Sequence, residues 1–422
     1  YKYLFTMFLN NYHHLKKKEI YTLILLIIFS IFIRIPTIAI FGDTSLDNEW
    51  GVLVNNLIVH GTLAINYQND NLHEYLLPNV FMPPLYAYYL YLFSFFNLEE
   101  QNYIHLILSS QIILASIAVV IFYKINKLFF SQKISFYSSL LFSLLPLHVY
   151  ACSQISSISL QICFTMLFFY FFFQFVGKKN FISIILFSFT AGLLILLRGE
   201  FIAILILSVV YLIVFFKASI RNILLIMLIS LITISPYLIR NILVFEKVTI
   251  TKSFGYNLWK GNNLEATVEG TKINNADLQK QIESIPINQF YGINFDKVHL
   301  HKAIENIDKE PIRYLILFVK KVISFLFIDI KSSQPNYYNP FHYLPLLLLG
   351  VTSLIGILIS DKKSYKLNYL ILIFFTNIFI FSIFFILPRY KLAILPLQII
   401  FTNILIQYIG KKFFNKQKNT SG

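Results

Sequence analysis

The sequence "GDTSLDNEWG" at residues 42–51 places three carboxylates directly after an apolar run that covers residues 20–41. A run of about twenty apolar residues is typical of a transmembrane helix, so Asp43, Asp47 and Glu49 stand where the chain has just left the bilayer. Acidic residues are also common in the first turn of a helix, where its dipole favours them. The stretch is therefore either a solvated helix start or part of a catalytic site at the membrane surface.

The composition is that of a membrane protein with many spans. Of the 422 residues, 57% are hydrophobic and only 13% are charged, and the mean hydropathy is +0.67. Soluble domains carry about a quarter charged residues. Repeated apolar runs of about twenty residues therefore predict an all-α polytopic membrane protein. Cys152 and Cys163 support neither a disulfide framework nor a zinc motif.

The basic residues indicate how the chain is oriented. Lysine and arginine outnumber aspartate and glutamate by 35 to 20, and they cluster in short loops, which places those loops in the cytoplasm and removes the need for a nucleic-acid partner. The basic loops lie at 15–19, 124–133, 177–180, 217–221, 361–366 and 411–418. About ten spans with both termini inside satisfy this pattern. The predicted spans are 20–41, 103–123, 134–150, 159–176, 180–197, 200–217, 222–242, 343–360, 367–387 and 390–410.

Two further apolar segments do not fit as spans. Residues 84–96 form a short run that opens with a proline pair, and residues 312–330 carry Lys320 and Lys321 at their centre. A charge in the hydrocarbon core costs at least about 2.5–3.5 kcal/mol. Crossing by either segment would also reverse the sidedness of the basic loops. We therefore expect two interfacial or re-entrant helices on the outer side.

This topology predicts three regions. Residues 1–242 form a seven-span module with an acidic first outer loop at 42–102, residues 243–342 form a second outer loop with an interfacial helix, and residues 343–422 form a three-span module with a basic cytoplasmic tail. Loops of this length are usually functional. The chemistry of the protein is therefore expected to face outward.

Arginines at the outer ends of spans suggest an anionic ligand. Arg198, Arg240 and Arg389 all lie at predicted outer ends, where the positive-inside rule disfavours them, and Lys391 is close to the last of them. A single arginine at such a place often extends to lipid headgroups. Three of them favour a phosphate ligand, because the guanidinium fork matches phosphate geometry.

A third signal is "SFGYNLWKGNN" at residues 253–263. Its glycine, asparagine and tryptophan residues are typical of a shaped loop, and aromatic rings beside amides often face sugars. Glycine and asparagine also form ordinary turns, so this signal is weak when it stands alone.

Short motifs follow one another in order along most of the chain. They are Glu49-Trp50 with Gly61 downstream, "PPLY" at 83–86, Pro146 with Ser153, Arg198 to Glu200, Pro236 to Asn241, Gly255 to Asn263, and Arg389 to Lys391. In this order they resemble the GT-C superfamily of polyprenyl-phosphate-sugar-dependent glycosyltransferases, and within it the bacterial protein O-mannosyltransferase and aminoarabinose-transferase (ArnT-like) group. The sequence departs from the family pattern because tryptophan replaces tyrosine after Glu49. The aspartate also precedes that glutamate by two residues, which leaves Asp43 and Asp47 both open as the base.

The resemblance implies a sugar transfer at the outer face of the membrane, in a multi-pass protein of the bacterial inner membrane whose site faces the periplasm. A sugar arrives on a polyisoprenyl phosphate among the membrane lipids. A hydroxyl of an acceptor glycan, lipid or protein attacks the anomeric carbon with inversion, and the lipid phosphate leaves. A carboxylate takes the acceptor proton and cations hold the phosphate. The implied residues are Asp47, Asp43 and Glu49 for catalysis, Arg240, Arg389, Lys391 and Arg198 for the phosphate, and Tyr256, Asn257, Asn262 and Asn263 for sugar or acceptor. No nucleotide is needed, and a divalent metal as a cofactor at the carboxylates is left open.

Two other classes share some of these features. A transporter or flippase of lipid-linked glycans would use outward arginines as well, but it should carry charged residues at mid-membrane and broken helix pairs. A polysaccharide polymerase also handles polyprenyl-linked glycans and has a long outer loop late in the chain. Candidate charged residues at mid-span are few in this sequence, which counts against a transporter.

Overall fold

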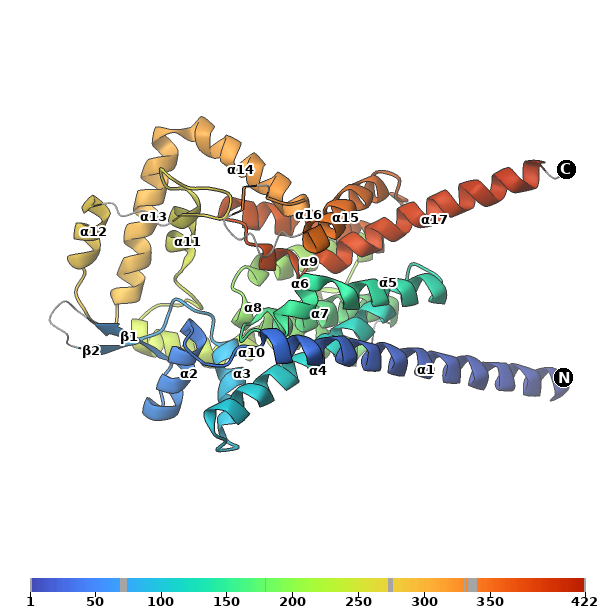
Figure 1. The fold of residues 1–422 in the computed structure, drawn as a ribbon, viewed down its shortest axis with the longest axis horizontal. Coiled ribbons are helices and arrows are strands. Elements are labelled where there is room, and N and C mark those ends of the chain that lie inside the picture. The colour runs from blue at the N-terminus through green and yellow to red at the C-terminus, as the bar shows by residue number, and fades with distance from the viewer. Residues whose placement is uncertain are drawn as a thin grey trace.

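The computed structural model describes residues 2–68, 74–178, 180–271, 276–329, 331–332 and 340–420. Helices form most of it and divide into a bundle and an outer layer (Figure 1). The bundle contains α1 (Lys2–Phe41), α4 (Glu100–Asn126), α5 (Gln132–Leu144), α6 (Pro146–Ala151), α7 (Ile158–Lys178), α8 (Phe181–Leu197), α9 (Phe201–Phe216), α10 (Ile220–Phe245), α15 (Pro340–Leu358), α16 (Tyr365–Ile383) and α17 (Leu395–Thr420). The predicted all-α architecture is confirmed.

The outer layer is built from the two long loops that the sequence predicts. Its elements are α2 (Glu49–His60), β1 (Ala64–Gln68), β2 (Glu74–Pro78), α3 (Leu85–Ser94), α11 (Phe254–Gly261), α12 (Ala276–Glu283), α13 (Tyr291–Lys309), α14 (Pro311–Leu326) and the short 3-10 helix η2 (Pro388–Lys391). Helices α11 to α13 lie beyond one end of the bundle, and both chain termini lie at the other end (Figure 1). This agrees with termini on the side opposite the outer loops.

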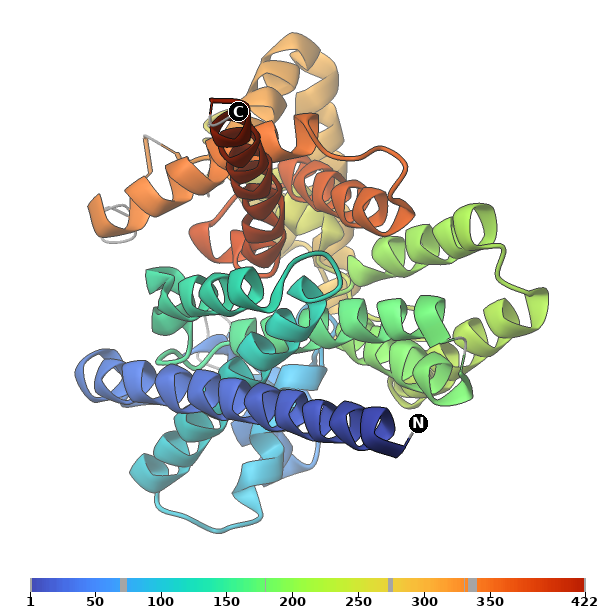
Figure 2. The same ribbon diagram turned by 90° about the vertical axis from the view of Figure 1, so that its right-hand side faces the viewer.

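Packing within the bundle follows the order of the chain. Helix α1 packs on α4, α4 on α7, α7 on α8 and α8 on α10, while α15 packs on α17. The C-terminal helices form a group of their own above the N-terminal ones in Figure 2. A largely apolar core of phenylalanine, leucine and isoleucine side chains joins the groups.

Six helices in the described part of the chain are long and apolar enough to cross a membrane. They are Lys17–Phe41, Glu100–Asn126, Ile158–Lys178, Ile220–Phe245, Pro340–Leu358 and Tyr365–Ile383. Helices α8 and α9 are apolar but shorter, with 17 and 16 residues. The predicted count of ten spans is therefore not confirmed. The predicted basic tail at 411–418 is helical, but its side chains from residue 413 onward lie outside the description.

The predicted span at 134–150 is wrong as a single helix. Helix α5 ends at Leu144 after 13 residues, and α6 begins at Pro146 and has only 6 residues. Pro146 has no backbone N–H and disfavours a helical conformation of the residue before it, and the helix breaks at this point. The chain from residue 152 to 157 is irregular, and this break lets it turn back towards α7.

A buried arginine lies beside this break. Arg34 of α1 has no exposed surface. Its guanidinium donates to the carbonyl oxygen and the hydroxyl of Ser30, at 2.9 and 2.8 Å, and lies 3.0 Å from Nδ1 of His148 in α6. Since arginine can only donate, Nδ1 must act as the acceptor in this contact. The pair therefore ties α1 to the broken helix.

The first outer loop begins with a capped helix. Asn48 accepts hydrogen bonds from the backbone N–H groups of Trp50 and Gly51, which starts α2 at Glu49. Gly61 ends α2 in the left-handed region at φ 66°, which glycine adopts without strain. An antiparallel pair of strands, β1 and β2, then follows, and the sequence did not predict it. The predicted helix at 84–96 is confirmed as α3.

Helix α14 confirms the second helix that was predicted to be interfacial. It is amphipathic, and its buried face includes Tyr314, Leu317, Lys321 and Phe325. Its exposed side chains at Ile312, Leu315, Ile316, Val319 and Ile323 form one apolar stripe. Sixteen helical residues extend about 24 Å, which is less than the hydrocarbon thickness of about 30 Å.

We expect this stripe to contact lipid in the outer leaflet. Ile316→Trp in vesicles that contain brominated lipids should therefore lose a large part of its added fluorescence, because bromine quenches tryptophan only at close range. Ile304→Trp on α13 is the matched control, since this isoleucine is also exposed but its helix lies beyond the end of the bundle (Figure 1). Equal quenching of the two variants, above the background of the two native tryptophans, would contradict the interfacial position.

Candidate active site

A cavity of about 1390 Å³ lies at the outer end of the bundle. It is larger than a typical small-molecule pocket of about 300–1,000 Å³. Its wall is formed by the loop after α1, the turn between α6 and α7, the α8–α9 loop, the segment that leads into α11, and the region between α16 and α17. The two long outer loops and several span ends therefore meet in one place.

All three predicted carboxylates line this cavity. Asp43 has a structural bond: its Oδ2 accepts from the backbone N–H of Ile155 at 2.6 Å, and its own N–H donates to the carbonyl of Ser153 at 2.9 Å. The exposed side chains of Asp47 and Glu49 accept no hydrogen bond from the described residues. Asp43 joins the loop to the α6–α7 turn, whereas Asp47 and Glu49 remain available to a ligand.

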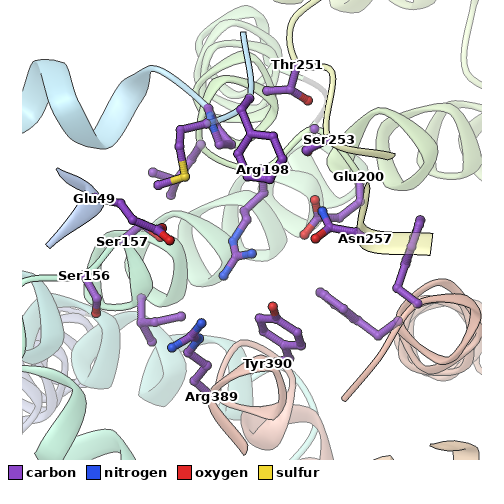
Figure 3. A pocket seen from close by; sticks show the side chains of 18 of the residues that line it. Glu49, Ser156, Ser157, Arg198, Glu200, Thr251, Ser253, Asn257, Arg389 and Tyr390 are labelled. Atoms are coloured by element: carbon purple, nitrogen blue, oxygen red, sulfur yellow. The ribbon is translucent and has the colours of Figure 1, made fainter. Parts of the chain in front are cut away.

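Two of the predicted arginines face the same cavity. The Cζ atoms of Arg198 and Arg389 lie 5.4 and 5.8 Å from the centre of the Tyr390 ring. Arg198 donates through Nε to Gln161 at 3.2 Å, and the guanidinium of Arg389 has no hydrogen bond to the described residues. Within the described chain neither forms an ion pair with a carboxylate, and both point into the open space in Figure 3. Two guanidinium groups held in this way suit an anion such as a phosphate.

The structure places the other two predicted phosphate ligands elsewhere. Arg240 is absent from the cavity wall, and its guanidinium donates to the carbonyl oxygens of Asn79 at 2.8 Å and Leu63 at 3.0 Å. Lys391 is buried and donates to the carbonyl of Phe327. Both cations therefore bind backbone oxygen atoms of the outer loops. Of the four cations that the resemblance implies for the phosphate, Arg198 and Arg389 therefore line the cavity with Asp47, and Arg240 and Lys391 do not.

This geometry predicts that Arg240→Ala destabilises the fold rather than the donor complex. The substitution removes the hydrogen bonds from the guanidinium to the carbonyls of Asn79 and Leu63, and a hydrogen bond to a charged group contributes about 1.5–3 kcal/mol. Arg221→Ala, at an exposed position near the other end of α10, serves as the control. Thermal unfolding should show a lower midpoint for Arg240→Ala alone. If Arg240→Ala instead unfolds at the wild-type midpoint but binds polyprenyl phosphate more weakly, Arg240 is a phosphate ligand and this prediction is wrong.

Two of the four predicted sugar-binding residues line the cavity. Tyr256 and Asn257 belong to α11, and the side chain of Asn257 faces the open space in Figure 3. Asp296 of α13 holds the start of α11, because its Oδ1 accepts from the backbone N–H of Tyr256 at 3.0 Å. Burial raises the pKa of Asp296 above its ordinary value. Helix α13 thus positions the residues that α11 presents to the cavity.

Asn262 and Asn263 are buried and do not reach the cavity wall. Asn262 donates to the carbonyl oxygens of Leu258 and Ile383 at 2.8 and 2.9 Å, and Asn263 donates to the carbonyl of Thr271. Their amides shape the loop after α11. As placed here, they cannot contact a sugar in the cavity.

Helix α14 carries a lysine, Lys321, on its packed face, and hydrogen bonds satisfy this buried amine. Its Nζ donates to the carbonyl of Gly261 at 2.8 Å and to Oδ1 of Asn262 at 3.2 Å. Burial lowers the pKa of this lysine to about 7. A side chain at Gly261 would place its Cβ 1.9 Å from the carbonyl oxygen of Phe384, so only glycine fits here. Lys321 therefore fastens α14 to the end of α11.

The cavity wall also contains polar residues that were assigned no role from the sequence. Among them are Gln154, Ser156, Ser157, Glu200, Thr249, Thr251 and Ser253. Glu200 stands in the "LRGE" motif, so a signal for it was present. The serines and threonines are too common in the sequence to be singled out without the fold.

A divalent metal at the carboxylates receives limited support from the protein. The described chain contains no group of three or more histidine, cysteine, aspartate or glutamate side chains that could hold a metal ion. Magnesium is commonly bound by one or two carboxylates together with substrate phosphates and water. A cation at Asp47 would therefore have to take its remaining ligands from substrate or water.

Comparison with known proteins supplies independent information. Residues 82–239 match the family model described as dolichyl-phosphate-mannose-protein mannosyltransferase. The apo crystal structure of the Archaeoglobus fulgidus oligosaccharyltransferase is similar with a TM-score of 0.55 and 12% identity, over 96% of this chain and 52% of that one. The archaeal oligosaccharyltransferase AglB from Archaeoglobus fulgidus, in complex with an inhibitory peptide and a dolichol-phosphate, gives a TM-score of 0.55 and 11% identity with the same coverage.

ArnT from Cupriavidus metallidurans, bound to undecaprenyl phosphate, is a weaker match with a TM-score of 0.44 and 11% identity, over 90% of this chain and 76% of that one. No protein of curated function matches the sequence. The chain spans about half the length of the archaeal enzyme. The mannosyltransferase-family match over residues 82–239 and the fold shared with the archaeal enzyme confirm the resemblance to the GT-C superfamily that the order of the short motifs predicts.

Proposed function

We propose that the protein is a glycosyltransferase that moves a sugar from a polyisoprenyl-phosphate donor to a hydroxyl acceptor at the outer face of the membrane. The observation that carries this proposal is one cavity lined by the carboxylates of Asp47 and Glu49 and by two arginines, Arg198 and Arg389, that form no ion pair within the described chain. The outer-layer elements that contribute to its wall lie at the end of the apolar bundle away from both termini (Figure 1). The match to a family that uses dolichyl-phosphate mannose supports a lipid-linked donor.

The phosphate of the donor binds between Arg198 and Arg389. Both guanidiniums lie near Tyr390, and hydrogen bonds from arginine to phosphate are among the stronger ones in proteins. They also stabilise the charge that grows on the phosphate oxygen as the bond to the sugar breaks. The complex of AglB with a dolichol-phosphate is consistent with such a ligand in this fold.

The carboxylate of Asp47 acts as the general base. It accepts the proton of the acceptor hydroxyl while the acceptor oxygen bonds to the anomeric carbon. The bond from that carbon to the phosphate oxygen breaks, and its electron pair leaves with the polyprenyl phosphate. One displacement of this kind inverts the anomeric carbon. Glu49 lies beside Asp47 in the same wall and orients the acceptor.

The cavity lies on the periplasmic side of a bacterial inner membrane, and the chain is divided into an N-terminal module at 1–242, the outer loop at 243–342 and a C-terminal module at 343–422. A lipid-linked donor supports this arrangement, because its head group lies at the membrane surface where the cavity opens. By the positive-inside rule, the basic loops lie in the cytoplasm, on the side of the membrane opposite the cavity.

The test uses the full-length protein in lipid nanodiscs with polyprenyl-phosphate mannose, the sugar named by the family match. We expect binding of the donor and release of polyprenyl phosphate when an acceptor is present. Other polyprenyl-phosphate sugars are tested in the same way. Movement of intact lipid-linked glycan across a vesicle membrane, with no release of polyprenyl phosphate from any donor, would overturn glycosyl transfer in favour of a flippase.

A further inference from the structure

Four of the polar side chains that the chemistry above leaves unused come from two parts of the cavity wall. Glu200 follows Arg198 in the α8–α9 loop, Thr251 and Ser253 lie in the segment that leads into α11, and Asn257 belongs to α11. None of the four side chains hydrogen bonds to a described residue. In the view of Figure 3, Glu200 and Asn257 lie close together, on the other side of Arg198 from Glu49.

Glu200 is the most informative of the four. Its Oε1 is shielded from solvent and receives no hydrogen bond from the described chain. It occupies the N-cap position of α9, where acidic side chains often bond to the helix, yet it makes no capping hydrogen bond. It forms no ion pair with Arg198 or Arg389 either, although all three line the same cavity. A partly buried carboxylate without donors is costly, so capping and ion pairing do not explain its presence.

The chemistry of the group indicates what would satisfy it. A carboxylate accepts hydrogen bonds and repels a second phosphate, whereas the asparagine amide and the two hydroxyls can both donate and accept. A neutral ligand with several adjacent hydroxyls matches this set. Such a ligand reaches Glu200 through the cavity that this residue lines.

We propose that Glu200 and Asn257 form a subsite for the hydroxyl groups of a sugar ring. This inference rests on the proposed function, because the cavity must first hold a sugar-phosphate donor. The ring has two sources: the donor sugar itself, or a sugar unit of the acceptor. Glu200 acts as a specificity residue in either case, since it touches the ring and not the bond that breaks.

The experiment compares Glu200→Gln with wild type in nanodiscs. Glutamine keeps the shape of the side chain and removes the charge that strengthens hydrogen bonds from hydroxyls. Glu265→Gln is the matched control, because Glu265 is exposed and lies outside the cavity wall. Binding is measured with polyprenyl phosphate and with polyprenyl-phosphate mannose, and transfer is measured through release of polyprenyl phosphate. Asn257→Ala serves as a second variant with the same expected direction.

If the ring belongs to the donor, Glu200→Gln binds polyprenyl-phosphate mannose about tenfold more weakly and polyprenyl phosphate as wild type does. If it belongs to the acceptor, both lipids bind normally and transfer falls about tenfold. If the role of Glu200 is purely structural, the substitution weakens the binding of both lipids equally and lowers the unfolding midpoint, and this result would overturn the subsite. Wild-type binding and wild-type transfer in Glu200→Gln and Asn257→Ala would also overturn it. A wild-type protein that binds neither lipid would overturn the proposed function itself.

Discussion

Replacing Asp47 by asparagine should lower sugar transfer about 10²–10⁴-fold, which is the usual contribution of a general base. Asparagine has the same shape, but it cannot take the proton of the acceptor hydroxyl. The side chain is exposed and has no hydrogen bond to the described residues, so the fold should not change. Binding of the donor should also be close to that of wild type, because the phosphate contacts are on other residues. The measurement is the release of polyprenyl phosphate from a polyprenyl-phosphate sugar in membranes.

Two neighbouring variants make this test specific. Asp43→Asn keeps an oxygen that can accept from the N–H of Ile155, so the protein should fold and lose less than about tenfold in rate. Glu49→Gln should lower the rate by an intermediate amount, because it orients the acceptor without taking the proton. Loss of transfer in Asp43→Asn with full activity in Asp47→Asn would move the base to Asp43. Full activity in both would leave "GDTSLDNEWG" as a solvated helix start.

The sequence predicted the fold class because a bilayer imposes a simple length rule on apolar helices. The break at Pro146 was missed although the proline was visible, because the apolar run continues through it from 134 to 150. The hairpin of β1 and β2 was missed for a different reason. Its strands are short, and Ile65, Tyr67 and Leu77 pack against α13 and the loop before it, more than two hundred residues later in the chain.

The candidate site shows which contacts a sequence cannot supply. Arg240 and Arg389 both stand at the ends of apolar segments, so the positive-inside argument treats them alike. Only the fold shows that the guanidinium of Arg240 donates hydrogen bonds to the carbonyls of Leu63 and Asn79. These partners are 177 and 161 residues away. In the same way, Asn262 faces α16 whereas Asn257 faces the cavity.

Replacing Arg389 by alanine should weaken the binding of polyprenyl phosphate about 10–100-fold. Hydrogen bonds to charged groups contribute about 1.5–3 kcal/mol each. The guanidinium of Arg389 forms no hydrogen bond with the described residues, so the substitution removes none from the fold. Arg389→Lys keeps the charge but not the fork, so its affinity should fall between those of alanine and wild type. Arg221→Ala, at an exposed position outside the cavity, is the control. Isothermal titration with polyprenyl phosphate in detergent micelles measures the change.

The double variant with Arg198→Ala decides whether the two arginines hold one phosphate. Arg198 and Arg389 contact the same tyrosine ring, so a shared phosphate would connect their effects. Residues that act on one ligand deviate from additivity by about 0.5–3 kcal/mol, whereas independent sites add within about 0.3–0.5 kcal/mol. We therefore expect the double variant to differ clearly from the sum of the single ones, and both effects to weaken at high salt. Additive losses of affinity would show that the two arginines act at separate sites. Unchanged affinity in both single variants would show that the phosphate does not bind in this cavity.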